Sequence, residues 1–210
     1  MGVPLNEPAA RQGVAGLGGI AALDAVRTAR EWPVPVLAGL DWPAHLTTAA
    51  LVLAALPRRL EPEIAGWALA GSIAIDLDHI PLYLWDTGAA TPGARPVTHS
   101  LLTPVLLLAA AALVRRLRVP LLGLALGVGL HLLRDIGTGP GVPLLWPFVP
   151  ASLQLPYGVY LAVVVALTAG AVLVAAPGLP GRQRRPTSWA SRDTRRNRGH
   201  EQSAQSVPER

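Results

Sequence analysis

The sequence predicts an all-α protein, a multi-pass membrane helical bundle of about five transmembrane helices. Hydrophobic residues make up 51% of the 210 positions and charged residues only 15%, whereas soluble globular domains carry about a quarter charged residues. The apolar residues are also gathered into runs of the length that a bilayer core requires. The chain has no cysteine, which excludes disulfides and thiolate metal sites.

The first stretch, 1–42, is rich in Gly, Ala and Pro, and we expect an N-terminal arm that is partly disordered. Positions 13–26 are mildly apolar, but they include Asp24 and are too few for a membrane span. A short surface helix or a loose arm is expected there. The region lacks the charged start and compact apolar core of a secretory signal, so no cleavage is predicted.

Five apolar segments follow within a membrane-embedded domain predicted at 43–178, namely 45–56, 63–80, 97–114, 119–136 and 157–176. Four of them reach the roughly 17–25 residues that a hydrocarbon core needs. The first is short, because its residues rise only about 18 Å as a helix. Several glycines would let these helices pack closely, namely Gly66, Gly71, Gly123, Gly127 and Gly129.

Arginine placement predicts the topology. Arginines lie between segments one and two, between three and four, and in the tail at 179–210. The positive-inside tendency puts these regions in the cytoplasm and the loops 81–96 and 137–155 outside. The tail is polar and Arg-rich, so it is expected to be disordered and to contact lipid headgroups. No nucleic-acid partner is expected.

Histidines and aspartates collect at the predicted outer ends of four segments. Such ionisable groups beside membrane spans are costly and usually mark a site. Two local spacings put candidate ligands on one helical face, His131 with Asp135 and Asp76 with His79. The predicted metal ligands are His45, Asp76, Asp78, His79, His99, His131 and Asp135.

His and Asp are ligands of hydrolytic metal centres, and this number suits one or two divalent ions, with zinc favoured. Asp78 is a bridging ligand, a general base, or the group that orients a ligand histidine. Arg95 and Arg134 are candidate contacts for a substrate phosphate, or partners in salt bridges. Each motif also has a simpler interpretation as a buried hydrogen bond, a helix cap or a solvated helix end.

The order of these motifs resembles the YdjM-like family of bacterial inner-membrane metal-dependent hydrolases. The motifs are His45, Asp76-Leu-Asp-His79, Arg95-Pro-Val-Thr-His-Ser100 and His131-Leu-Leu-Arg-Asp135, followed by Thr138 and Leu145-Trp-Pro-Phe148. They cover about 43–150. One departure is Ala94-Arg95-Pro96, where the family often has His-Arg-Gly. The resemblance implies hydrolysis, and a remoter likeness to zinc-dependent phospholipases and nucleases suggests a phosphoester.

The sequence therefore predicts a hydrolase in the bacterial inner membrane, with a cytoplasmic C-terminus and a site near the outer face. A lipid or lipid-linked phosphoester would suit a site beside the headgroups. Two other classes stay open. A metal-ion or small-solute transporter would place its site near the bilayer midplane. A non-catalytic membrane adaptor would act through the Arg-rich tail.

Overall fold

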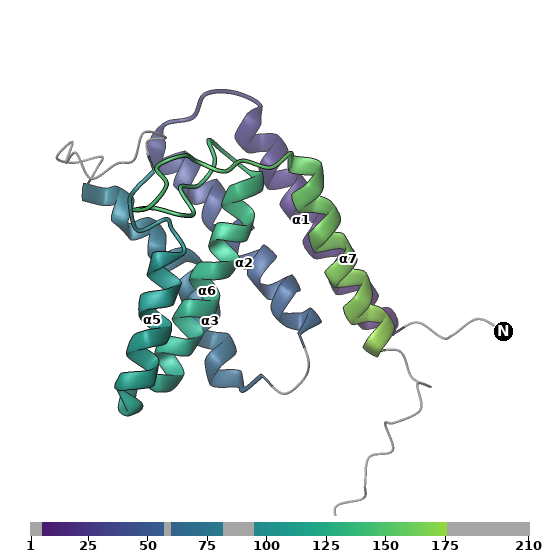
Figure 1. Cartoon of the computed structure of the whole chain (residues 1–210). Coiled ribbons are helices and arrows are strands. Elements are labelled where there is room, and N and C mark those ends of the chain that lie inside the picture. Colours follow the sequence, from purple (N-terminus) through teal and green to yellow (C-terminus); the bar gives the residue numbers. More distant parts are fainter. Residues whose placement is uncertain (1–5, 57–59, 82–94, 176–210) are drawn as a thin grey trace, which may run out of the picture. The chain divides into compact units, whose positions relative to one another are not determined.

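The computed structural model describes residues 6–56, 60–81 and 95–175, and these residues fold as helices without a β-strand (Figure 1). An isolated antiparallel bridge joins Val142 to Leu153. The helices are α1 (Glu7–Thr28), α2 (Val34–Ala55), α3 (Pro62–Ala74), η1 (Ile75–Asp78), α5 (Leu102–Leu113), η2 (Arg115–Leu117), α6 (Arg118–Gly137) and α7 (Tyr157–Ala175). The all-α prediction is confirmed for this part of the chain.

The N-terminal region differs from the expected short helix or loose arm. α1 is 22 residues long, begins with a cap from the Asn6 side chain and packs against α2 and α7. Ile20 is fully buried beside Tyr160 and Val164 of α7. Two of its glycines allow close contact, since a Cβ at Gly13 would lie 2.7 Å from Thr168 of α7 and one at Gly16 would lie 3.0 Å from Leu51 of α2.

α2 begins at Val34 rather than at position 45. Its 22 residues rise about 33 Å at 1.5 Å each, which removes the problem of a first segment too short to span. Asp41 and Pro43 interrupt the apolar run in the sequence, yet the helix continues through both. His45 consequently lies within α2 and not at its start.

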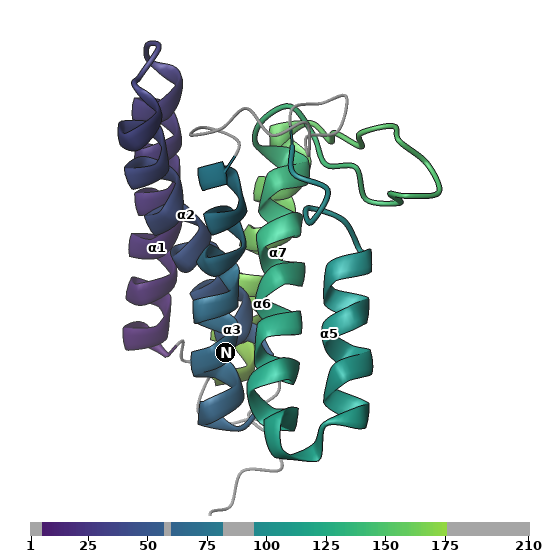
Figure 2. The same cartoon turned by 90° about the vertical axis from the view of Figure 1, so that its left-hand side faces the viewer.

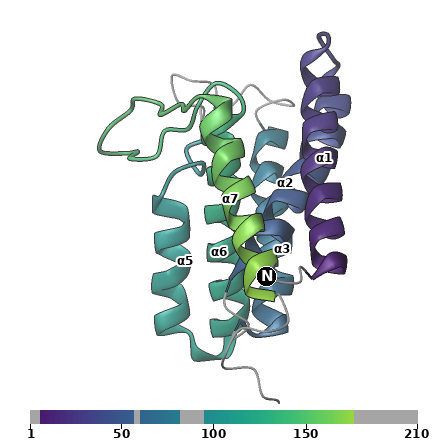
Figure 3. The ribbon, with the colours of Figure 1, turned by 90° about the vertical axis from the view of Figure 1, so that its right-hand side faces the viewer.

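α3 and α6 make the closest helix pair in the bundle, and α5 lies along α6 on the side away from α1 (Figures 2 and 3). Small residues permit the contact. A Cβ at Gly127 would lie 2.2 Å from the carbonyl oxygen of Ala68, and one at Gly123 would lie 2.3 Å from the Trp67 Cβ. Close packing is confirmed at Gly71 as well, whereas Gly66 and Gly129 face open space.

Three of the described helices are long and apolar enough to cross a membrane: Pro35–Ala55, Arg115–Gly137 and Tyr157–Val174. α5 is a shorter apolar helix. Large apolar side chains face outward on it, including Leu106 at 58% and Leu113 at 83% exposure, as expected for a surface in contact with lipid. The predicted tail at 179–210 lies outside the described residues.

Replacing Gly127 with Ala should destabilise the protein by about 1–3 kcal/mol, because α3 must move away from the added methyl group. Gly129→Ala is the matched control in the same helix, where a Cβ meets nothing within 4 Å. Thermal unfolding in detergent should give a lower Tm for Gly127→Ala alone. Equal Tm values for the two variants would contradict the close α3–α6 contact.

Candidate metal centre

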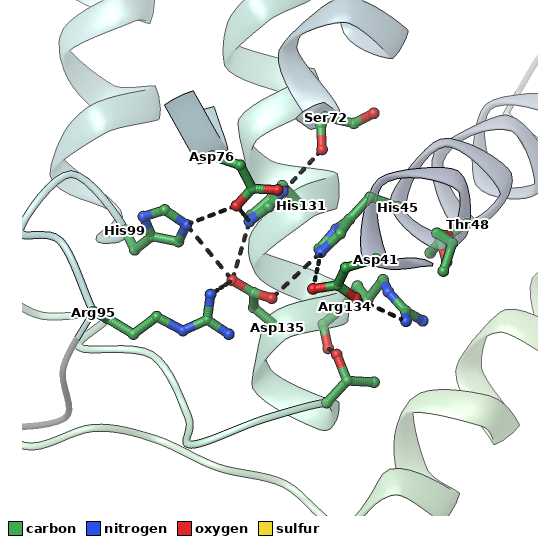
Figure 4. Close-up of polar contacts among 12 residues, drawn as sticks. Asp41, His45, Thr48, Ser72, Asp76, Arg95, His99, His131, Arg134 and Asp135 are labelled. Carbon is green, nitrogen blue, oxygen red and sulfur yellow. Dashed lines mark hydrogen bonds and ion pairs between the residues drawn. The ribbon is translucent and has the colours of Figure 1, made fainter. Parts of the chain in front are cut away.

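Four separate segments bring the predicted ligands together, and Figure 4 labels His45, Asp76, His99, His131 and Asp135 among them. α2 contributes His45 from its middle, and the turn that ends α3 contributes Asp76, Asp78 and His79. The loop before α5 carries His99, and the last turns of α6 carry His131 and Asp135. Side chains far apart in the sequence therefore meet inside the bundle.

The first group of candidate ligands is His45, His131 and Asp135, whose ligand atoms lie within 4.8 Å of one another. The Asp135 carboxylate lies 3.0 Å from His131 Nε2 and 3.5 Å from His45 Nε2. The two imidazole rings stack with centroids 3.9 Å apart. All three side chains are buried.

The backbone of α3 fixes the orientation of His131. The His131 Nδ1 lies 2.8 Å from the carbonyl oxygen of Ser72, so Nδ1–H donates to it and Nε2 faces the carboxylates. Metal-binding histidines commonly use the second ring nitrogen in this way.

The second group is Asp76, His79 and His99, also with ligand atoms within 4.8 Å. Asp76 Oδ1 lies 3.5 Å from His99 Nε2 and 3.8 Å from His79 Nδ1. Asp78 lies 3.0 Å from His79 Nδ1 and 3.2 Å from His99 Nδ1. Asp78 joins the cluster because residues 75–78 form a 3₁₀ turn. Around the axis of such a turn, the side chains of Asp76 and Asp78 lie about 120° apart, whereas in an α-helix they would lie about 160° apart.

The two groups form one continuous site. His131 Nε2 lies 3.4 Å from Asp76 Oδ1, and His99 Nε2 lies 3.8 Å from Asp135 Oδ2. Exposure rises across the site, from 0–1% for His45, His99, His131 and Asp135 to 14–21% for Asp76, His79 and Asp78. Access is therefore from the side of η1.

Several buried atoms in this cluster have no hydrogen-bond partner among the described residues. They are both ring nitrogens of His45, Nε2 of His99 and Oδ1 of Asp135. Buried polar atoms are normally paired, because an unpaired one costs about 1–3 kcal/mol. Ring nitrogens and carboxylate oxygens that converge without forming a hydrogen bond with one another fit a divalent cation.

The two predicted phosphate contacts lie in different surroundings. Arg95 reaches the cluster, with Nη1 2.8 Å from Asp135 Oδ2. Arg134 is fully buried and turns the other way, with Nη2 2.5 Å from Asp24 Oδ1 and 3.3 Å from Asp41 Oδ1. It also donates to the Tyr160 hydroxyl at 3.2 Å. Of the two roles that the sequence allows for Arg134, phosphate contact or salt bridge, the structure shows the salt bridge. Its partners, Asp24 and Asp41, are not among the predicted site residues.

Sequence reasoning missed Asp24 and Asp41. Asp41 Oδ2 lies 3.7 Å from His45 Nε2, and Oδ1 faces Arg134 and Arg27. Its spacing of four residues from His45 indicates a shared helical face. Asp41, however, lies in the stretch 1–42 that the sequence predicts as an arm. Asp24 gave no such signal, because its partner is distant in the sequence.

Apolar helices of spanning length around a buried His and Asp cluster define an integral membrane protein with a candidate metal centre. The chain belongs to the YdjM inner membrane protein family, whose model matches residues 40–192 and so contains every predicted ligand. It is accordingly an inner-membrane protein, and the expected family is confirmed. No curated protein and no solved structure matches the chain. α1 lies outside the family match.

Removing the Asp24 carboxylate should be strongly destabilising, because it leaves the Arg134 guanidinium buried with fewer counter-charges. We expect Asp24→Ala to cost about 3–5 kcal/mol of unfolding free energy. Glu7→Ala is the control, since Glu7 pairs with Arg11 in the same helix with both side chains more than three-quarters exposed. Chemical denaturation in detergent measures both. A loss for Asp24→Ala no larger than for Glu7→Ala would refute the buried pair.

Proposed function

We propose that this protein is a membrane-embedded, metal-dependent hydrolase that acts on a phosphoester or lipid-linked substrate at the outer membrane face. The observation that carries the proposal is the convergence of four histidines and three aspartates in one cluster, which is buried at His45, His99, His131 and Asp135 and includes ligand atoms without a hydrogen bond. Such a concentration of ionisable groups inside an apolar bundle is costly unless a cation compensates it.

Zinc suits the donor set of imidazoles and carboxylates best. His45, His131 and Asp135 would hold one ion, and Asp76, His79 and His99 a second or a share of the first. A divalent ion bound there would supply Lewis acidity, polarising a phosphoryl oxygen and activating water at neutral pH. Water would add to phosphorus while the ester P–O bond breaks, and the proton that the water loses would pass to the oxygen of the departing alcohol.

The protein's own residues orient the site. The Ser72 carbonyl sets the tautomer of His131, and Asp78 faces the Nδ1 atoms of both His79 and His99. Because two imidazoles and the Thr98 hydroxyl engage Asp78, we assign it to orienting these ligands rather than to general-base catalysis. This supporting layer suits a resident ion, and it favours the hydrolase over a transporter.

Arg95 is the candidate phosphate contact within the site. Its salt bridge to Asp135 places a guanidinium beside the ligand cluster, where a substrate phosphate could share it. Arg134 does not suit that role, because Asp24, Asp41 and Tyr160 engage both of its terminal nitrogens, Nη1 and Nη2.

The protein should bind zinc in near-stoichiometric amounts, and His131→Ala should lose most of it because this imidazole contacts both groups. His200→Ala is the histidine control, at a position outside the described residues. Elemental analysis of purified protein in detergent gives the metal content. Wild-type protein without bound metal after zinc supply, or unchanged content in His131→Ala, would reject the metal centre. A screen of phospholipid and phosphoester substrates would then test hydrolysis.

The proposed topology has five spans, with the loops 81–96 and 137–155 outside and the C-terminus in the cytoplasm, because the arginines cluster at alternate connections. A phosphatase fused to the C-terminus should be inactive, since that enzyme works only outside the cytoplasm. A fusion within the loop 137–155 should be active. The reverse pattern would invert the topology.

A further inference from the structure

A cavity of about 580 Å³ opens where α1 turns into α2. Its lining carries two guanidinium groups and one carboxylate, from Arg27, Arg30 and Glu31. Trp32 lies under Arg30, with the guanidinium carbon 3.5 Å from the ring centroid. The other described lining residues are Thr28, Leu37 and Gly139.

Gly139 connects this cavity to the predicted ligands. It lies in the loop that follows Asp135 and α6, with a φ of +124°, a conformation that favours glycine. A Cβ at Gly139 would lie 3.1 Å from Arg95 Nη2 and 3.7 Å from Arg27 Nη2. Two guanidinium groups therefore approach the same point on the cavity wall.

Arg27 is also coupled to the centre through a carboxylate. Its Nε lies 3.9 Å from Asp41 Oδ1, and Asp41 Oδ2 lies 3.7 Å from His45. This contact holds the Arg27 side chain near Gly139, with 22% of it exposed. Arg27 is thus partly desolvated and fixed in direction, and both properties strengthen a bond to an anion.

We propose that this cavity is the phosphate-binding subsite of the protein, in which Arg27 and Arg95 hold one phosphate group and Arg30 widens the positive rim. A phosphate bound over Gly139 would lie next to the Arg95–Asp135 pair at the edge of the ligand cluster. The phosphate belongs either to a lipid headgroup or to a soluble ester. The inference extends the proposed hydrolase, but the binding itself needs no metal.

The test uses the full chain in detergent, stripped of metal with a chelator, and inorganic phosphate as the probe. Isothermal titration should give an affinity about tenfold weaker in Arg27→Gln, the loss expected for a charge-assisted hydrogen bond. Arg11→Gln is the matched control in the same helix, where the side chain is 82% exposed. Unchanged affinity in Arg27→Gln, or an equal loss in Arg11→Gln, would overturn the proposal.

Two further measurements do not depend on the folding of Arg27→Gln. Glu31→Gln removes from the rim a negative charge that repels phosphate, so it should tighten phosphate binding about twofold at low salt. In the wild-type chain, phosphate should protect Arg27 but not Arg11 from phenylglyoxal, as read by mass spectrometry of peptides. Weaker binding in Glu31→Gln, or equal modification of Arg27 with and without phosphate, would count against the subsite.

Competition separates the two sources of phosphate. Short-chain phosphatidylglycerol that displaces inorganic phosphate would assign the subsite to a lipid headgroup, and displacement by glycerol phosphate alone would assign it to a soluble ester. Both results support the subsite. Phosphate binding in a protein that takes up no zinc would refute the hydrolase and keep the anion site. Zinc uptake without phosphate binding would refute the phosphate subsite and leave the proposed hydrolase standing.

Discussion

The cost of burying charge in an apolar bundle is the constraint that organises this molecule. The buried side chains of His45, Arg95, Arg134 and Asp135 each lie against a group of opposite sign, and the bundle is arranged so that these contacts form. The consequence is that α1, α2, α3 and α6 meet through polar side chains as well as through packing. The same contacts that hold the helices in register also bring imidazoles and carboxylates into one place.

α6 joins two buried networks that serve different purposes. Arg134 and Asp135 are neighbours in the chain, about 100° apart around the helix. Asp135 faces His45, His131 and Arg95 in the ligand cluster, whereas Arg134 faces Asp24 and Tyr160 between α1 and α7. Asp41 contacts both networks. The glycine face of α6 lets α3 approach, which puts the Ser72 carbonyl within reach of His131.

The local hydrophobic pattern predicts correctly those helices that are continuous apolar runs in the sequence. α6 and α7 begin and end within two residues of the predicted segments, and the ligand residues at helix ends were found from their cost in a membrane. α1 and the start of α2 were missed, because Asp24, Asp41 and Pro43 break the apolar pattern. These helices depend on pairs with Arg27 and Arg134 that are distant in the sequence, and no local signal encodes such pairs.

Charge also constrains how a substrate could reach the ligand cluster. The cluster contains three carboxylates, from Asp76, Asp78 and Asp135. A phosphate within a few ångströms of these carboxylates would be repelled by their negative charge. A cation among the ligands reverses that repulsion locally, but the approach still needs positive charge. Arg95 at the edge and Arg27 beyond Gly139 form such an approach, and Asp41 fixes Arg27 on it. The acidic cluster and the basic cavity are therefore best understood as two parts of one site, each suited to a partner of opposite charge.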